Sequence, residues 1–290
     1  MSQTLDLEVK LFPQKYTFQI KGSLHIWDRP QVMAIVNLTP DSFFEGSRFS
    51  WSDGSAKRGI EKMIHDGADL LDLGAYSSRP GASVVSTEEE MDRVLPVIEW
   101  IKAEYPQVLI SIDTFRSRVA KEAVNSGATI INDISGGELD SEMLRTVGQL
   151  KVPYIAMHMR GNPQTMQGKT NYSDIFSEIL LYFSEKLEKF RNFGINDAII
   201  DVGFGFAKTL DQNYLLLKHL SYFKSLGLPI LVGVSRKSMI YKFLEISANE
   251  ALNGSTAMHM QALIQGANIL RVHDIKEAKE TVKLYKKLYP

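Results

Sequence analysis

Cysteine is absent from this chain of 290 residues. Its absence excludes disulfide bonds, thiolate metal sites and a cysteine nucleophile, and it is typical of a cytoplasmic protein. Long apolar runs are absent too: none reaches the roughly 18 residues of a membrane-spanning helix, and no signal peptide is evident at the start. Neither sign of charge is in excess, because 33 Lys and Arg stand against 34 Asp and Glu. We therefore expect no membrane and no nucleic-acid partner.

Short apolar runs alternate with longer amphipathic stretches along the sequence. The runs predict eight strands, at residues 32–36, 70–73, 109–112, 129–131, 153–157, 198–200, 230–234 and 268–272. The stretches between them predict helices at residues 55–65, 88–104, 116–125, 141–150, 172–193, 211–223, 238–244, 249–265 and 275–288. Thr87 is the predicted N-cap of the helix over 88–104.

Strands that alternate with helices predict a parallel sheet, and continuously apolar strands predict that both of its faces are covered. Eight such units without a break favour a closed (β/α)8 TIM barrel, formed as one domain over residues 1–290. A doubly wound open sheet is the alternative. Residues 8–27 predict a short N-terminal β-hairpin that covers the bottom of the barrel.

Polar residues follow every predicted strand. In a barrel these positions meet at the C-terminal face, where the active sites of such enzymes lie. A single Asn or Asp there is usually a helix N-cap, and Asp133 or Asp274 needs no other role. Caps alone do not explain the whole set, which is Asn37, Asp113, Asn132, Asp201, Lys237, Arg271 and His273. Together these side chains predict a polar ring that holds a heterocycle rich in hydrogen-bond donors and acceptors.

Two carboxylates of this ring, Asp113 and Asp201, are three strands apart. An ionised carboxylate accepts strong hydrogen bonds from the N–H groups of an amino-heterocycle. A structural hydrogen-bonded pair in the barrel mouth is the alternative. A tight zinc site is not expected, because only His158 and His273 lie at strand ends.

The last two loops carry four cationic groups, Arg236, Lys237, Arg271 and His273. Barrels commonly bind phosphate at these two loops, and Arg offers a planar fork to phosphate oxygens. Because cations are unfavourable at helix N-termini, their presence here indicates an anion that offsets them. Basic surface residues near a helix start are the alternative. Two further loops, at residues 37–51 and 77–86, are long enough to act as lids, or they are tolerated surface insertions.

Eight short blocks in this order resemble the dihydropteroate synthases of folate biosynthesis. The blocks are Asn37-Leu-Thr-Pro-Asp-Ser-Phe43, Ser78-Arg-Pro-Gly81, Ser111-Ile-Asp-Thr114, Asn132-Asp-Ile-Ser-Gly136, Met157-His-Met159, Asp201-Val-Gly-Phe-Gly-Phe206, Ser235-Arg-Lys-Ser238 and Arg271-Val-His-Asp274. The resemblance extends from about residue 32 to residue 287. Each block alone is weakly specific, whereas the ordered set is highly specific.

The resemblance implies a transferase. Members of this family join 6-hydroxymethyl-7,8-dihydropterin diphosphate to p-aminobenzoate and release pyrophosphate and 7,8-dihydropteroate. The resemblance also implies small-molecule substrates, Mg²⁺ as cofactor with Asn37 as its ligand, sulfonamides as inhibitors, and a homodimer formed through the outer helices. It favours a dissociative path, in which C–O cleavage precedes attack by the amine and Asp113 is the counter-charge to the pterin cation.

The resemblance also implies roles for individual residues. The residues expected to bind the pterin are Asp113, Asn132, Met157, Asp201 and Lys237, and those expected to bind the diphosphate are Asn37, Ser78, Arg271 and His273. The residues expected to bind p-aminobenzoate are Arg79, Pro80, Phe206, Lys237 and Ser238. The residues expected to act in catalysis are Asp113, Lys237, Arg271 and His273. Three positions depart from the usual family residues: Ser78 replaces Thr, Val202 replaces Pro and Ala207 replaces Gly. The last two bear on pocket shape and therefore on sulfonamide affinity.

Three other functions compete with this interpretation. A methyltetrahydrofolate-dependent methyltransferase shares the pterin-binding Asp and Asn positions, but it does not need the cations of the last two loops. A non-catalytic paralogue would have lost part of the phosphate-binding or loop set, and this chain keeps all of it. An aldolase would carry a Schiff-base lysine on a central strand, and no such lysine lies at the ends of strands five or six.

Overall fold

The computed structural model describes residues 15–20, 22–39, 54–76 and 85–290. Within these ranges eight parallel strands form a closed barrel, in the order β10-β3-β4-β5-β6-β7-β8-β9. The strands are β3 (Gln31–Asn37), β4 (Leu70–Gly74), β5 (Leu109–Asp113), β6 (Ile130–Asp133), β7 (Tyr154–Met157), β8 (Ala198–Asp201), β9 (Ile230–Val232) and β10 (Ile269–Val272). The TIM barrel is therefore confirmed, and the open sheet is wrong because β10 pairs with both β3 and β9.

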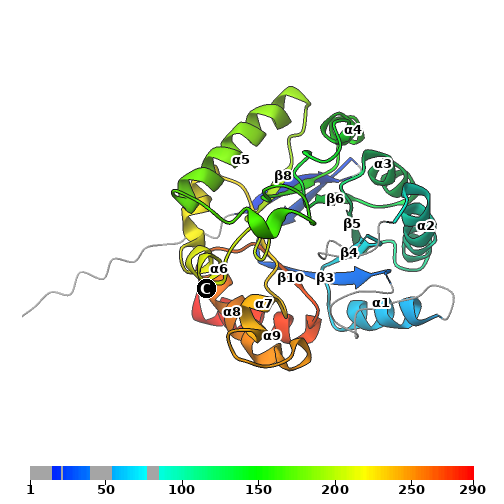
Figure 1. Ribbon diagram of the computed structural model, residues 1–290. Helices are drawn as coiled ribbons and strands as arrows, with labels where there is room; N and C mark the ends of the chain where they lie inside the picture. Colours follow the sequence, from blue (N-terminus) through cyan, green and yellow to red (C-terminus); the bar gives the residue numbers. More distant parts are fainter. Residues whose placement is uncertain (1–14, 21, 40–53, 77–84) are drawn as a thin grey trace, which may run out of the picture.

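Helices surround the strands as a ring in Figure 1. They are α1 (Ser55–His65), α2 (Thr87–Glu104), α3 (Ser117–Ser126), α4 (Met143–Leu150), α5 (Ile175–Asn192), α6 (Leu210–Lys218), α7 (Ser238–Tyr241), α8 (Leu252–Ile264) and α9 (Ile275–Leu288). Short 3-10 turns are η2 (Met166–Gly168), η3 (Leu220–Leu226) and η4 (Ala248–Glu250). None of the described helices is both long and apolar enough to cross a membrane.

Several helix ends differ from the predictions by up to about three residues, and two differences have a clear local cause. The N-cap of α2 is Ser86 and not Thr87, because the Ser86 hydroxyl accepts a hydrogen bond from the Glu89 amide at 3.1 Å and Thr87 is already helical. The predicted helix over 211–223 is two elements, α6 and η3, which are separated at His219.

The N-terminal hairpin covers one end of the barrel. Its strands β1 (Tyr16–Ile20) and β2 (Ser23–Trp27) pair antiparallel, which confirms the predicted hairpin over its described part. Phe18 and Trp27 are buried, and their rings lie 4.4 Å apart between centroids. They pack with Ile20 against one inward-facing residue from each of several strands: Met33, Leu70, Ile130, Ile155, Ile199, Leu231 and Ile269. This apolar layer closes the N-terminal end, so the opposite end is the one available to a ligand.

Candidate active site

Most of the predicted site residues lie at the C-terminal ends of the barrel strands. Asn37, Asp113 and Asp201 are each the last residue of a strand, and Asn132 is the residue before last. Strand register places Asn37 beside Gly74, Gly74 beside Asp113 and Asp113 beside Asn132. The structure thus brings these polar groups to one level of the barrel mouth.

Arg271 connects two carboxylates at this level. Its Nε donates to Asp72 Oδ2 at 2.6 Å, and its Nη2 donates to Asp113 Oδ2 at 2.7 Å. Asn132 Nδ2 donates to the same Asp72 oxygen at 3.0 Å. Gly74 leaves room for this arrangement, because a β-carbon on it would lie 3.3 Å from the Asp113 β-carbon. Asp113 and Asn132, which were predicted at the pterin, therefore share one hydrogen-bonded network with Arg271, which was predicted at the diphosphate.

Electrostatics differ between the members of this network. Burial raises the pKa of Asp113, Arg271 opposes this shift and Asp72 adds to it, with a net value of about 7. Burial alone would lower the pKa of Arg271, but Asp72 and Asp113 together raise it above its ordinary value. The guanidinium therefore stays charged, whereas the Asp113 carboxyl can gain or lose its proton near neutral pH.

Lys237 and Asp201 form a second polar group on the opposite side of the mouth. Lys237 Nζ donates to the Phe204 carbonyl at 2.6 Å and lies 5.0 Å from the centroid of the Phe206 ring. Burial lowers the pKa of Lys237 to about 8, although Asp201 favours its charged form. Burial raises the pKa of Asp201, which accepts the Gly203 amide at 2.8 Å. The predicted pterin-binding pair and the predicted p-aminobenzoate residue Phe206 are thus neighbours.

Lys208 is a buried residue that the sequence interpretation missed. Its Nζ lies 3.1 Å from His158 Nδ1 and donates to the carbonyls of Gly203 and Phe206 at 3.0 Å each. Burial lowers the pKa of Lys208 to about 7, and burial followed by Lys208 lowers that of His158 to about 2. Gly203 has φ +75°, and a β-carbon there would lie 2.0 Å from the His158 carbonyl. The only signal in the sequence was a lysine two residues after the Gly-Phe-Gly-Phe segment.

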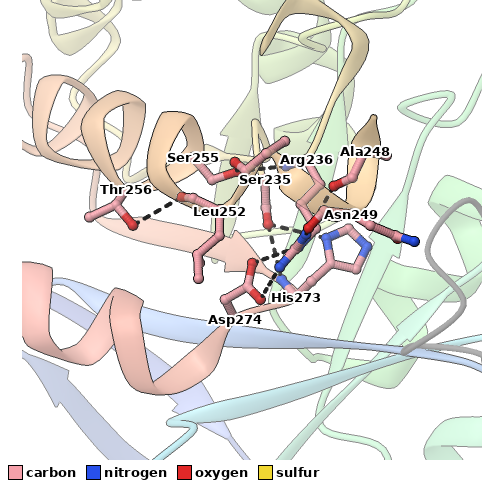
Figure 2. Close-up of polar contacts among 10 residues, drawn as sticks. Ser235, Arg236, Ala248, Asn249, Leu252, Ser255, Thr256, His273 and Asp274 are labelled. Carbon is pink, nitrogen blue, oxygen red and sulfur yellow. Dashed lines mark hydrogen bonds and ion pairs between the residues drawn. The ribbon is translucent and has the colours of Figure 1, made fainter. Parts of the chain in front are cut away.

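Arg236 does not have the role that its position suggested. Its guanidinium pairs with Asp274 through Nε at 2.9 Å and Nη2 at 2.8 Å, and Nη1 donates to the carbonyls of Ala248 and Asn249 (Figure 2). The side chain is 7% exposed, so the cation is consumed in joining the loops after β9 and β10. The expectation that Arg236 contributes to an anion site is therefore wrong.

His273 lies beside this ion pair and faces Ser235. The Ser235 hydroxyl is 3.1 Å from His273 Nδ1 and accepts the His273 amide at 3.2 Å, as Figure 2 shows. Burial, with Arg271 as the next contribution, lowers the pKa of His273 to about 3. His273 is therefore neutral at pH 7 in this structure. Ser238 is the first residue of α7, directly after Lys237.

A small apolar cluster lies next to the charged groups. It consists of Ile134, Met157, Met159, Met166 and Ala207, with Phe115 and Phe206 packed against it. Met157 is thus buried at the predicted pterin end, in register with Asp201. Ala207 has φ +50°, a left-handed conformation that favours glycine. The mouth therefore combines an apolar cluster with charged groups.

The remaining predicted site residues, Ser78, Arg79 and Pro80, lie outside the described residues, as does most of each predicted lid. Among the residues that are described, no group of three or more His, Asp or Glu side chains could hold a metal ion. His158 and His273 each have another partner. Mg²⁺ prefers oxygen ligands and often takes few of them from the protein; Asn37, the last residue of β3, would offer it an amide oxygen.

Comparisons with known proteins fit this geometry. The sequence model for the pterin-binding enzymes matches residues 33–273. The dihydropteroate synthase of a Synechocystis strain is 43% identical over 259 residues, which are 88% of this chain and 89% of the relative. This chain belongs to the dihydropteroate synthases. Among solved structures, the Yersinia pestis enzyme in a sulfonamide drug complex has a TM-score of 0.90 and 38% identity and covers 94% of this chain and 99% of that chain. The Xanthomonas albilineans enzyme with 4-aminobenzoic acid has a TM-score of 0.85 and 36% identity, over 94% of this chain and 98% of its own.

Proposed function

We propose that this chain condenses 6-hydroxymethyl-7,8-dihydropterin diphosphate with p-aminobenzoate to form 7,8-dihydropteroate and pyrophosphate. Its family membership supports this reaction, and relatives have been solved with 4-aminobenzoic acid and with a sulfonamide. The observation that carries the proposal is the joining of Arg271 to Asp113 at the barrel mouth, 2.7 Å apart. The Arg271 guanidinium, which would bind the leaving diphosphate, then lies next to the Asp113 carboxylate, which would stabilise the pterin cation that remains.

The proposed pterin pocket has acceptors on both sides and an apolar floor. Asp113 and Asn132 on one side and Asp201 on the other suit the N–H edge of a pterin. Met157 lies in the apolar cluster on which a planar ring can rest. Lys237 Nζ lies 5.0 Å from the centroid of the Phe206 ring, and Asp201 favours its charged form, so its ammonium group would contact both substrates. Ser238, Arg79 and Pro80 complete the proposed p-aminobenzoate site.

The proposed chemistry needs no nucleophile from the protein. The C–O bond to the diphosphate breaks and its electron pair leaves with pyrophosphate, which Arg271, His273, Asn37 and Ser78 would bind. The resulting pterin methylene cation is stabilised by the Asp113 carboxylate. The p-aminobenzoate amine then forms the C–N bond and loses a proton. Asn37 would hold Mg²⁺, which supplies further positive charge against the diphosphate oxygens when it is bound.

A direct assay tests the reaction. Purified protein is incubated with the dihydropterin diphosphate, p-aminobenzoate and Mg²⁺, and both products are quantified by chromatography. We expect dihydropteroate and pyrophosphate in equal amounts, and loss of both when Mg²⁺ is chelated. Pyrophosphate without dihydropteroate would indicate hydrolysis of the diphosphate instead. Absence of both products would refute the proposal.

We also propose a cytoplasmic homodimer formed by the C-terminal helices. Large apolar side chains are exposed just after α7 and along α9: Phe243, Leu244, Leu284 and Leu288. Exposed apolar groups of this size commonly mark protein interfaces. Sedimentation velocity of the wild type and of Phe243→Glu would test this surface. A monomeric wild type at micromolar concentration would refute the dimer.

A further inference from the structure

One buried oxygen atom organises two parts of the proposed site. Asp72 lies on β4, two residues before the strand end, and its side chain is 0% exposed. Its Oδ2 accepts hydrogen bonds from Arg271 Nε at 2.6 Å and from Asn132 Nδ2 at 3.0 Å. Arg271 is expected at the diphosphate and Asn132 at the pterin. The same atom therefore fixes one residue for each half of the substrate.

Arg271 is held at two depths. Its Nε is bound to Asp72, which a ligand at the mouth cannot reach because Asp72 is fully buried. Its Nη2 is bound to Asp113, whose side chain is 25% exposed. A diphosphate oxygen can therefore replace Asp113 at Nη2 while the bond to Asp72 is kept. The deep contact fixes the position of the guanidinium during this exchange.

Charge favours the exchange at Asp113. Two ionised carboxylates around one guanidinium carry a net negative charge, which opposes an incoming diphosphate. Burial raises the pKa of Asp113 to about 7, so near neutral pH part of Asp113 is protonated, which reduces both this opposition and the attraction of Asp113 to Arg271. Once Arg271 has turned to the diphosphate, Asp113 is released toward the pterin.

Asp72 also determines which group Asn132 shows to a ligand. An ionised carboxylate only accepts hydrogen bonds, so the NH₂ group of Asn132 must face Asp72. The Oδ1 of Asn132 is then the atom left to accept from a ligand. The Asn132 amide thereby joins the Asp113 and Asp201 carboxylates as an acceptor for N–H groups.

From these contacts, and given the proposed function, we propose that Asp72 is a positioning residue of the condensation. It holds Arg271 through Nε while Nη2 exchanges Asp113 for a diphosphate oxygen, and it sets the orientation of the Asn132 amide. Asp72 itself touches neither substrate. Its removal should weaken binding of the diphosphate and of the pterin together, although these groups bind different residues.

Binding to two separate probes tests the proposal. Isothermal titration calorimetry would measure pyrophosphate and 6-hydroxymethylpterin on the wild type and three variants. Asp72→Asn keeps an oxygen acceptor but loses the charge, and Asp72→Ala loses both. Ser111→Ala is the matched control, because Ser111 is buried beside Asp72 in register and its hydroxyl has no hydrogen-bond partner among the described residues. Circular dichroism and thermal unfolding show whether each variant is folded.

We expect Asp72→Asn to bind each probe about tenfold more weakly, because a neutral acceptor replaces a charge-assisted one. Asp72→Ala should lose more affinity for each probe, and the affinities of Ser111→Ala should stay within about twofold of those of the wild type. KM for p-aminobenzoate should not change in Asp72→Asn. If Asp72→Ala does not fold, Asp72→Asn alone decides the outcome.

Two results would overturn the proposal. Folded Asp72→Asn that binds both probes as the wild type does would show a purely structural role. Tighter pyrophosphate binding by Asp72→Asn would show that Asp72 acts only through its negative charge. The two binding measurements need no turnover: a wild type that binds both probes but forms no dihydropteroate would refute the proposed reaction and leave the comparison of Asp72 variants by binding intact. A wild type that binds neither probe overturns both.

Discussion

The two ends of the barrel bury different chemistry. At the N-terminal end, Phe18 and Trp27 of the hairpin pack against apolar side chains from the strands. At the C-terminal end, the same strands carry Asp113, Asn132 and Asp201 around Arg271 and Lys237. The apolar end stabilises the fold through non-directional packing. Each charged group at the mouth, in contrast, needs a hydrogen-bonding or oppositely charged partner in order to be buried.

A single strand shows how short the distance between these regions is. Along β5, Leu109 packs against the hairpin cluster, Ser111 lies in the middle of the barrel and Asp113 lies at the mouth. Alternate residues of a strand face the same side, so inward positions two residues apart pass from the core to the site. Stability and function can therefore be altered separately on the same strand.

The largest expected effect is at the mouth. Asp113→Asn should lower kcat by about 100-fold or more, because it removes the charge that faces the pterin cation. The melting temperature should change little, since burial already disfavours the charged form of Asp113. Equal losses of turnover and stability would instead make Asp113 a structural residue.

The same residue should control the pH dependence. Burial raises the pKa of Asp113 to about 7 in the free protein. If the ionised form is the active one, kcat/KM of the wild type should rise between about pH 6 and pH 8. The residual activity of Asp113→Asn should be flat over this range. A parallel rise in the variant would assign the titration to another group.

A substitution in the apolar layer at the N-terminal end of the barrel should affect stability but not turnover. Trp27→Ala removes a buried indole from the hairpin cluster and should lower the free energy of unfolding by about 3 kcal/mol. Urea unfolding measures this loss, and kcat per folded molecule should match the wild type. A tenfold fall in kcat at full folding would mean that the two ends are coupled.

Lys208 should make stability depend on pH. Burial lowers its pKa to about 7, so from this pH up to the ordinary lysine range the unfolded chain binds a proton that the folded protein has released. Stability of the wild type should therefore rise with pH in this window. Relative to Lys208→Met, the wild type should gain about 1 kcal/mol between pH 7 and pH 8 in urea unfolding. A constant difference between the two proteins would contradict the lowered pKa.

The smallest effect is expected at Ala207. Glycine would relieve the strain of φ +50°, but it would also remove a buried methyl group and add flexibility to the unfolded chain. Because these contributions oppose one another, Ala207→Gly should change the free energy of unfolding by less than about 1 kcal/mol. A larger change would show that the loop after β8 is strained beyond this residue.

The barrel was predictable because its signals are local. Each strand is a short apolar run and most helices are amphipathic, so the eight strands could be located to within about two residues at each end. The polar residues at the strand ends were also visible, since a parallel barrel brings all these ends to one face. The Arg236 interpretation failed because charge in the sequence does not show whether a partner is near, and Asp274 is 38 residues away.

The sequence by itself determined the fold, the functional end of the barrel and, through its ordered blocks, the family. Only the tertiary structure decided which charges serve a ligand and which serve the protein. Asp72 and Arg271 are 199 residues apart in the chain, and only closure of the barrel between β10 and β3 brings them within 2.6 Å. Periodicity records which face a residue occupies, whereas the partner of a buried charge depends on strands that meet only when the sheet closes.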